Sequence, residues 1–159
     1  MDKQTNVRHF CPDMISQVRT AAMGEVRTQI TLINADDEAL ARRGGLKRKR
    51  PRSCTLEAMV DSGAIRLVAP PKVVRRLGLS IVRDELVEYA DGRTEVVGVT
   101  SPITVDWEGR QAAEDALVLG KEVLIGQTVL EKLDLLVDCK RNRLVPNPAH
   151  PDGPVMMVK

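Results

Sequence analysis

Ala58-Met59-Val60-Asp61-Ser62-Gly63-Ala64 joins a short apolar run to a polar turn. The apolar run predicts a strand that enters the core and carries a carboxylate at its end. Ser62 and Gly63 follow, and both residue types are favoured in turns. A carboxylate held in this way can act as a general acid or base, so Asp61 is the candidate catalytic residue.

A second apolar run ends at a glycine roughly sixty residues further along the chain. It reads Val123-Leu124-Ile125-Gly126, and it is followed by a helix predicted over Thr128 to Leu133 and by the apolar segment Leu135-Leu136-Val137-Asp138. We find no internal repeat in the sequence, so a duplication of the catalytic element within this chain is not expected.

These elements resemble those of the retropepsin-like (retroviral-type, clan AA) aspartic proteases, in particular their small bacterial members. The segment from Val137 to Pro146 looks like the closing segment of the bacterial proteins. The resemblance covers residues 24–148. It implies a mainly β domain with the acid-protease fold, a closed barrel with two short helices and one lobe per chain.

The resemblance also implies the chemistry of an aspartic-type endopeptidase, in which two carboxylates share one proton and activate a water molecule. A chain of 159 residues is too short for two catalytic lobes, and only Asp61 lies in the motif. The second carboxylate is therefore expected from Asp61 of another copy in a homodimer. Ser62 would support the loop by a hydrogen bond across the axis, while Gly63 and Ala64 leave space for backbone and substrate.

A hairpin about thirty residues after Asp61 stands where this family has its flap. Asp91-Gly92 is a strong signal for a tight turn between two strands. If this hairpin is a flap, it would close over a bound polypeptide. Tyr89 is a candidate substrate contact by position, and Gly126 is expected to let its strand approach the Asp61 loop closely.

Further turns complete the predicted domain. A short helix is expected from Pro70-Pro71 to Gly78, since proline favours a helix start and glycine a helix end. A second hairpin is predicted around Trp107-Glu108-Gly109-Arg110, joining Ile103-Thr104-Val105 to Ala116-Leu117-Val118-Leu119.

The chain divides into a central domain and two flanking segments. Residues 1–23 are predicted to be an N-terminal appendage of unknown role, residues 24–148 the protease-like domain, and residues 149–159 a C-terminal tail rich in proline. Within the domain, residues 44–53 form a basic loop, which we expect to be exposed because its composition cannot bury much surface.

Composition narrows the chemistry further. Cys11, Cys54 and Cys139 are odd in number and lack metal-ligand spacing, so neither a disulfide framework nor a metal site is expected. His9 and His150 lie near opposite ends of the chain, which disfavours a serine or cysteine protease arrangement. No cofactor is expected. The sequence has no apolar run long enough to span a membrane, and we expect a cytoplasmic protein.

Two alternatives remain open. The first is a non-catalytic member of the same fold that binds peptides or mediates dimerisation. The second is a nucleic-acid-binding module that uses the basic run Lys47 to Arg52. The second is disfavoured because Phe10, Tyr89 and Trp107 are the only aromatic residues, too few for base stacking. The expected partners are a second copy and a polypeptide substrate, without a membrane or nucleic acid.

Overall fold

A computed structural model describes residues 24–158 of the chain. The predicted N-terminal appendage, residues 1–23, lies outside the described residues. The described part is mainly β, as predicted, and contains eleven strands and three helices. The strands are β1 (Val26–Asn34), β2 (Ser53–Val60), β3 (Leu67–Ala69), β4 (Ile81–Glu88), β5 (Thr94–Thr100), β6 (Ile103–Trp107), β7 (Arg110–Glu114), β8 (Ala116–Val118), β9 (Leu124–Ile125), β10 (Leu135–Asp138) and β11 (Arg143–Pro146). The helices are α1 (Ala35–Arg42), α2 (Pro71–Leu77) and α3 (Gln127–Leu133).

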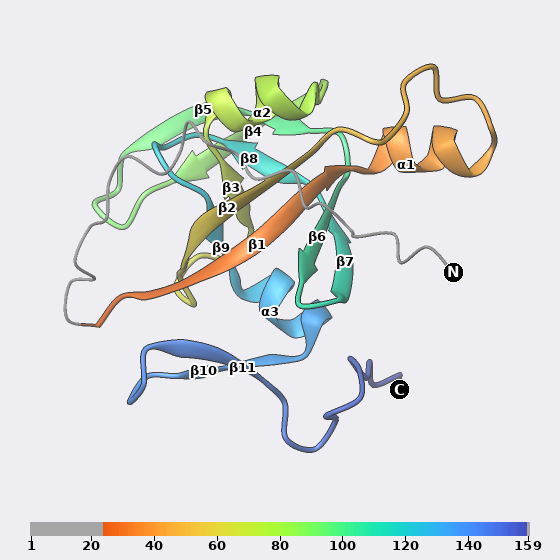
Figure 1. Cartoon of the computed structure of the whole chain (residues 1–159). Coiled ribbons are helices and arrows are strands. Elements are labelled where there is room, and N and C mark those ends of the chain that lie inside the picture. Colours follow the sequence, from red (N-terminus) through yellow and green to blue (C-terminus); the bar gives the residue numbers. More distant parts are fainter. Residues whose placement is uncertain (1–23, 159) are drawn as a thin grey trace.

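Nine strands form one sheet in the order β4-β5-β8-β3-β9-β2-β1-β6-β7. Strands β4 and β7 are its two edges, and β10 pairs with β11 in a separate antiparallel hairpin. Figure 1 shows this hairpin below α3, and β11 packs against β1 of the large sheet. Strand β2 lies inside the sheet, between β1 and β9. β1 pairs with β2 along its whole length, whereas β9 pairs only with Met59 and Val60 at its end.

The core forms on one side of the long strands. Along β1, Val26, Ile30 and Leu32 are buried while Gln29 faces outward, because successive side chains of a strand point to opposite faces. β1 pairs with β2 in antiparallel register, with Val26 opposite Val60. Burial of these apolar side chains is the main contribution that stabilises the domain.

The predicted helix after Pro70 is α2, and Gly78 ends it in the left-handed conformation at φ 60°. The prediction of two helices was wrong, because a third helix, α1, forms at Ala35–Arg42, where no helix was predicted. The side chain of Asn34 caps α1 by accepting a hydrogen bond from the Asp37 N–H at 3.0 Å. Asn34 is buried and also donates to the carbonyl of Leu77, so tertiary contacts stabilise this polar helix.

The second hairpin is tighter than predicted. Strand β6 pairs with β7 through the two-residue turn Glu108-Gly109, in which both residues have positive φ. The expected partner strand from Ala116 is β8, which instead lies parallel to β3. The local turn signal was correct, but it could not show that Arg110–Glu114 would form the nearer strand.

The start of the C-terminal tail is attached to the domain by Arg110. This buried guanidinium donates hydrogen bonds to the carbonyls of Leu133 and Asp134 at the end of α3, and to those of His150 and Pro151 in the tail. The carboxylate of Asp134 also accepts hydrogen bonds from the tail.

Candidate active site

Asp61 directly follows strand β2, at the end of β2 that pairs with β9. Its N–H donates to the carbonyl of Ile125 at 3.0 Å, which continues the parallel pairing of Met59 with Leu124 and of Val60 with Ile125. The backbone of Asp61 is therefore fixed by the sheet. The residue is half-buried.

The next residues form a tight turn around the carboxylate. The Gly63 N–H donates to Asp61 Oδ1 at 2.9 Å, and the Ala64 N–H donates to the Asp61 carbonyl at 3.1 Å. Ser62 and Gly63 are exposed. A Cβ at Gly63 would lie 3.2 Å from Asp61 Oδ1, so a side chain there would press on the carboxylate. The turn orients one carboxylate oxygen by a backbone donor.

The turn is bonded on its other side to the start of α3. The Gln127 N–H donates to the carbonyl of Ala64 at 2.8 Å, and the Thr128 N–H donates to that of Ile65 at 3.0 Å. A Cβ at Gly126 would lie 2.4 Å from the carbonyl oxygen of Arg66 and 2.7 Å from its backbone nitrogen. Only glycine permits this contact between the two segments. The structure thus brings Gly126 to the Asp61 loop.

One polar atom beside this contact has no partner. The hydroxyl oxygen of Thr128 is buried, and within residues 24–158 no hydrogen bond reaches it. Buried polar groups are usually paired, so this hydroxyl contributes a cost to the region that holds the candidate catalytic loop.

Arg66 connects the loop to the predicted flap. Its guanidinium donates to Glu85 Oε2 of β4 at 2.6 Å and to the carboxylate of Asp115. Arg83 of β4 also pairs with Asp115, at 3.0 Å. Although partial burial opposes it, hydrogen bonding to Arg66 and Arg83 lowers the pKa of Asp115. These four charged side chains, hereafter the Arg66 cluster, join the end of the loop to β4.

The flap prediction rests on a hairpin that does form, between β4 and β5. At its tip Gly92 has φ 81°, and its N–H donates to the carbonyl of Tyr89 at 2.8 Å. The Tyr89 hydroxyl donates to Glu95 Oε2 at 2.6 Å, and this hydrogen bond raises the pKa of Tyr89. Asp91 pairs with Arg93.

The contacts of Tyr89 and Asp91 stay within this hairpin, in the part of the chain that the structure describes. β4 reaches the loop through Glu85 instead. Sequence reasoning missed Glu85 and Asp115 because nothing in the local pattern pairs them with Arg66.

Among residues 24–158, no group of three or more His, Cys, Asp or Glu side chains is placed to hold a metal ion. Over the same residues, no helix is long and apolar enough to cross a membrane.

Comparison with known proteins gave similarity at the level of structure only. No family model matches the sequence, and no curated protein matches it. The chain is similar in fold to EIAV protease in complex with the inhibitor HBY-793, with 22% identity, a TM-score of 0.43 and coverage of 66% of this chain and 86% of that chain. It is also similar to the retroviral protease-like domain of Ddi1 from Leishmania major, with 19% identity, a TM-score of 0.49 and coverage of 80% and 90%.

Proposed function

We propose that this chain is one half of an aspartic-type endopeptidase, whose active site forms when two copies bring their Asp61 carboxylates together. The observation that carries this proposal is the Asp61 loop itself. The half-buried Asp61 directly follows strand β2, and its N–H is bonded to β9. The loop after it is bonded to the start of α3, and one carboxylate oxygen accepts from the Gly63 N–H. Within the described residues, Asp61 forms no ion pair that would occupy the carboxylate.

Two copies are needed because a single carboxylate cannot act as base and acid at once. In the proposed dimer the two Asp61 side chains share one proton, since two negative charges in contact are unfavourable. The unprotonated carboxylate takes a proton from water as the water oxygen attacks the peptide carbonyl carbon. The protonated one donates its proton to the carbonyl oxygen. The intermediate then collapses as the C–N bond breaks. The nitrogen takes the proton that the first carboxylate removed from water, and the second carboxylate takes back a proton from a hydroxyl of the intermediate.

The other loop residues support this chemistry by position. Ser62 is exposed, so its hydroxyl is available to bond the partner's loop across the two-fold axis. Gly63 lets the substrate backbone approach the carboxylate, because it has no side chain. The β4–β5 hairpin would cover the bound polypeptide, and the Arg66 cluster would hold the base of that hairpin near the loop.

The test compares the wild-type chain with Asp61→Asn by digestion of a broad peptide library from acidic to neutral pH. The substitution keeps the shape of the side chain but removes the acid–base group, so cleavage should fall by about a thousandfold or more. Asp152→Asn is the matched control, because Asp152 is an exposed aspartate in the tail. Sedimentation equilibrium should show that wild type and Asp61→Asn dimerise equally.

Mixing the two chains gives a second readout. Excess Asp61→Asn should inhibit the wild type, because mixed dimers contain only one acid. Hydrolysis by a monomer, or wild-type activity unaffected by excess Asp61→Asn, would contradict the proposal. A dimer that cleaves nothing at any pH would favour the non-catalytic peptide-binding or dimerisation module.

A further inference from the structure

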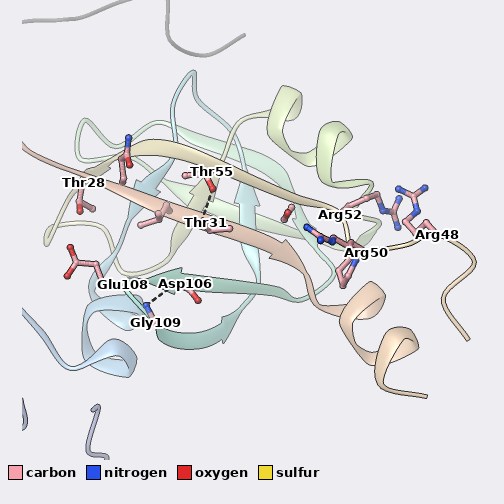
Figure 2. Close-up of a pocket in the computed structure, with 13 residues that line it drawn as sticks. Thr28, Thr31, Arg48, Arg50, Arg52, Thr55, Asp106, Glu108 and Gly109 are labelled. Carbon is pink, nitrogen blue, oxygen red and sulfur yellow. Dashed lines mark hydrogen bonds between the residues drawn. The ribbon is translucent and has the colours of Figure 1, made fainter. Parts of the chain in front are cut away.

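A second surface of the molecule carries a groove. A groove of about 750 Å³ lies on the outer face of β1, β2 and β6, with the basic loop at one end and the β6–β7 turn at the other (Figure 2). None of the residues Asp61 to Ala64 lines it. Strand β2 rises about 3.3 Å per residue, so Ser53, which lines the groove, is roughly 26 Å from Asp61.

The floor of the groove is polar. Thr31 lies opposite Thr55 on one side and opposite Asp106 on the other, and the two threonine hydroxyls share a hydrogen bond of 2.8 Å. Gln29 adds an exposed amide to the same face. Hydroxyl and amide groups can both donate and accept hydrogen bonds, so this floor suits the N–H and C=O groups of a peptide backbone.

One end of the groove is positive. Figure 2 shows Arg48, Arg50 and Arg52 gathered there. Arg52 is engaged, because it donates to both carboxylate oxygens of the buried Asp37, at 2.7 and 2.8 Å. This pair fixes the end of the loop. Arg48 and Arg50 are exposed, and among residues 24–158 neither forms an ion pair. Their guanidinium groups are therefore available to a carboxylate from outside.

The other end is negative. Asp106 and Glu108 line the groove at the β6–β7 turn, where Figure 2 shows them far from the arginines. Asp106 has internal partners, since it accepts from the Gly109 N–H at 3.1 Å and from the Gln111 side chain at 2.8 Å. The Glu108 carboxylate forms no ion pair within the described residues. Its positive φ of 48° belongs to the tight turn that presents it.

Opposite charges at the two ends decide what kind of ligand fits. A nucleic acid is negative along its whole length, so a strand that reached from the arginines along the floor would meet Glu108 and Asp106. A peptide can carry an acidic residue at one end and a basic residue at the other.

We propose that this groove binds an extended segment of another protein, with its acidic residue on Arg48 and Arg50 and its basic residue near Glu108. The site goes beyond the endopeptidase function and does not depend on it.

The experiment measures binding by fluorescence anisotropy on the full chain carrying Asp61→Asn, so that no probe is cleaved. The main probe is a short labelled peptide with glutamates at one end, lysines at the other, and serine and alanine between them. Arg48→Glu with Arg50→Glu should weaken its binding by about tenfold or more, because both guanidinium contacts are reversed. Lys47→Glu with Lys49→Glu is the matched control, since it makes the same charge change in the same loop outside the groove lining. This control should change binding by less than about twofold.

Two further measurements separate a peptide from a nucleic acid. Glu108→Lys should weaken binding of the charged peptide by about threefold or more, because it removes the acidic end. A labelled oligothymidine should bind more weakly than the peptide at the same salt concentration. Three results would overturn the proposal: equal losses in the two double variants, no binding of the peptide, or tighter binding of the oligothymidine that Glu108→Lys strengthens.

Discussion

Strand β2 has a candidate site at each end, and the chain holds the two ends by different means. At the end after Val60, the Asp61 loop is fixed by backbone hydrogen bonds to β9 and α3 and by the close contact of Gly126 with Arg66. At the end that begins at Ser53, the basic loop is held in addition by a buried side chain. Asp37 accepts two hydrogen bonds from the Arg52 guanidinium and one from the Arg52 N–H, beside the backbone bond from Asn34 N–H to the Arg52 carbonyl.

The difference shows how each end keeps its functional side chains available. The Asp61 loop is held by backbone bonds, so no ion pair is needed to fix it. Among the described residues the Asp61 carboxylate forms no ion pair, and it is therefore available for proton transfer. At the basic loop, one guanidinium is used to position the others, and Arg48 and Arg50 stay exposed. We therefore expect the Asp61 end to be sensitive to shape and the basic end to be sensitive to charge and pH.

The largest effect is expected from Gly126→Ala. The new Cβ would overlap the backbone of Arg66, and the segments must move apart. We expect the free energy of unfolding to fall by about 3 kcal/mol and hydrolysis to be lost. Urea denaturation measures the first effect and peptide digestion the second. Gly153→Ala is the control, because a Cβ there meets no atom within 4 Å. If Gly126→Ala and Gly153→Ala are equally stable, the close contact of Gly126 with Arg66 does not control the stability of the Asp61 end.

A smaller effect is expected from Asp37→Asn. The variant leaves Arg52 without its charged partner, and we expect a loss of about 2 kcal/mol at neutral pH. Hydrogen bonding from Arg52 lowers the pKa of Asp37 from 3.8 to about 2, against the effect of burial. The stabilisation is therefore present above pH 3.8 and is lost as the pH falls towards about 2.

The measurement for this variant is urea denaturation at several pH values, with Asp36→Asn as the control because Asp36 is exposed in the same helical turn. The stability gap between wild type and Asp37→Asn should narrow as the pH falls. If the difference in unfolding free energy between wild type and Asp37→Asn stays constant down to about pH 2, charge does not hold the Ser53 end of β2.

Arg66→Met tests a charged cluster that supports the Asp61 end. The cluster is partly exposed, so its loss should cost about 1 kcal/mol. The cost should shrink in high salt because mobile ions screen exposed charges. Arg75→Met is the control, since Arg75 is exposed on α2. A cost independent of salt would assign the role of Arg66 to packing of its aliphatic stem.

The smallest effect is expected from Thr128→Val. The threonine hydroxyl is buried without a partner among residues 24–158, and valine has nearly the same shape. Removing the hydroxyl should stabilise the protein by about 0.5 kcal/mol. Thermal unfolding measures the change, with Thr94→Val as an exposed control. A clear loss of stability would indicate that the hydroxyl does have a partner in solution.

Much of the strand content could be predicted from sequence, because alternation reports which face of a strand is buried. This holds for β1, and the Asp91-Gly92 turn likewise predicted the β4–β5 hairpin. Helix α1 was missed because its sequence is polar, although Asn34 followed by acidic residues is a helix-start signal. The pairing of β8 with β3 was also missed, since no local pattern specifies a distant partner strand.

Some features of the two candidate sites could likewise be predicted from the sequence, and others could not. A short motif was enough to single out Asp61 with Ser62 and Gly63, because the turn is made by neighbouring residues. The Arg66 cluster and the Asp37–Arg52 pair depend on side chains that meet only after folding. The groove spans three strands and the basic loop, so its opposite charges could not be seen along the sequence.

The hydrogen bonds of Arg110 set a practical limit for anyone who shortens or tags this protein. Its guanidinium is nearly inaccessible to water and takes two of its acceptors from His150 and Pro151. A chain cut after Pro148 would remove two of the four acceptors of this cation and uncover it. An affinity tag is better placed beyond Gly153, where these acceptors are kept.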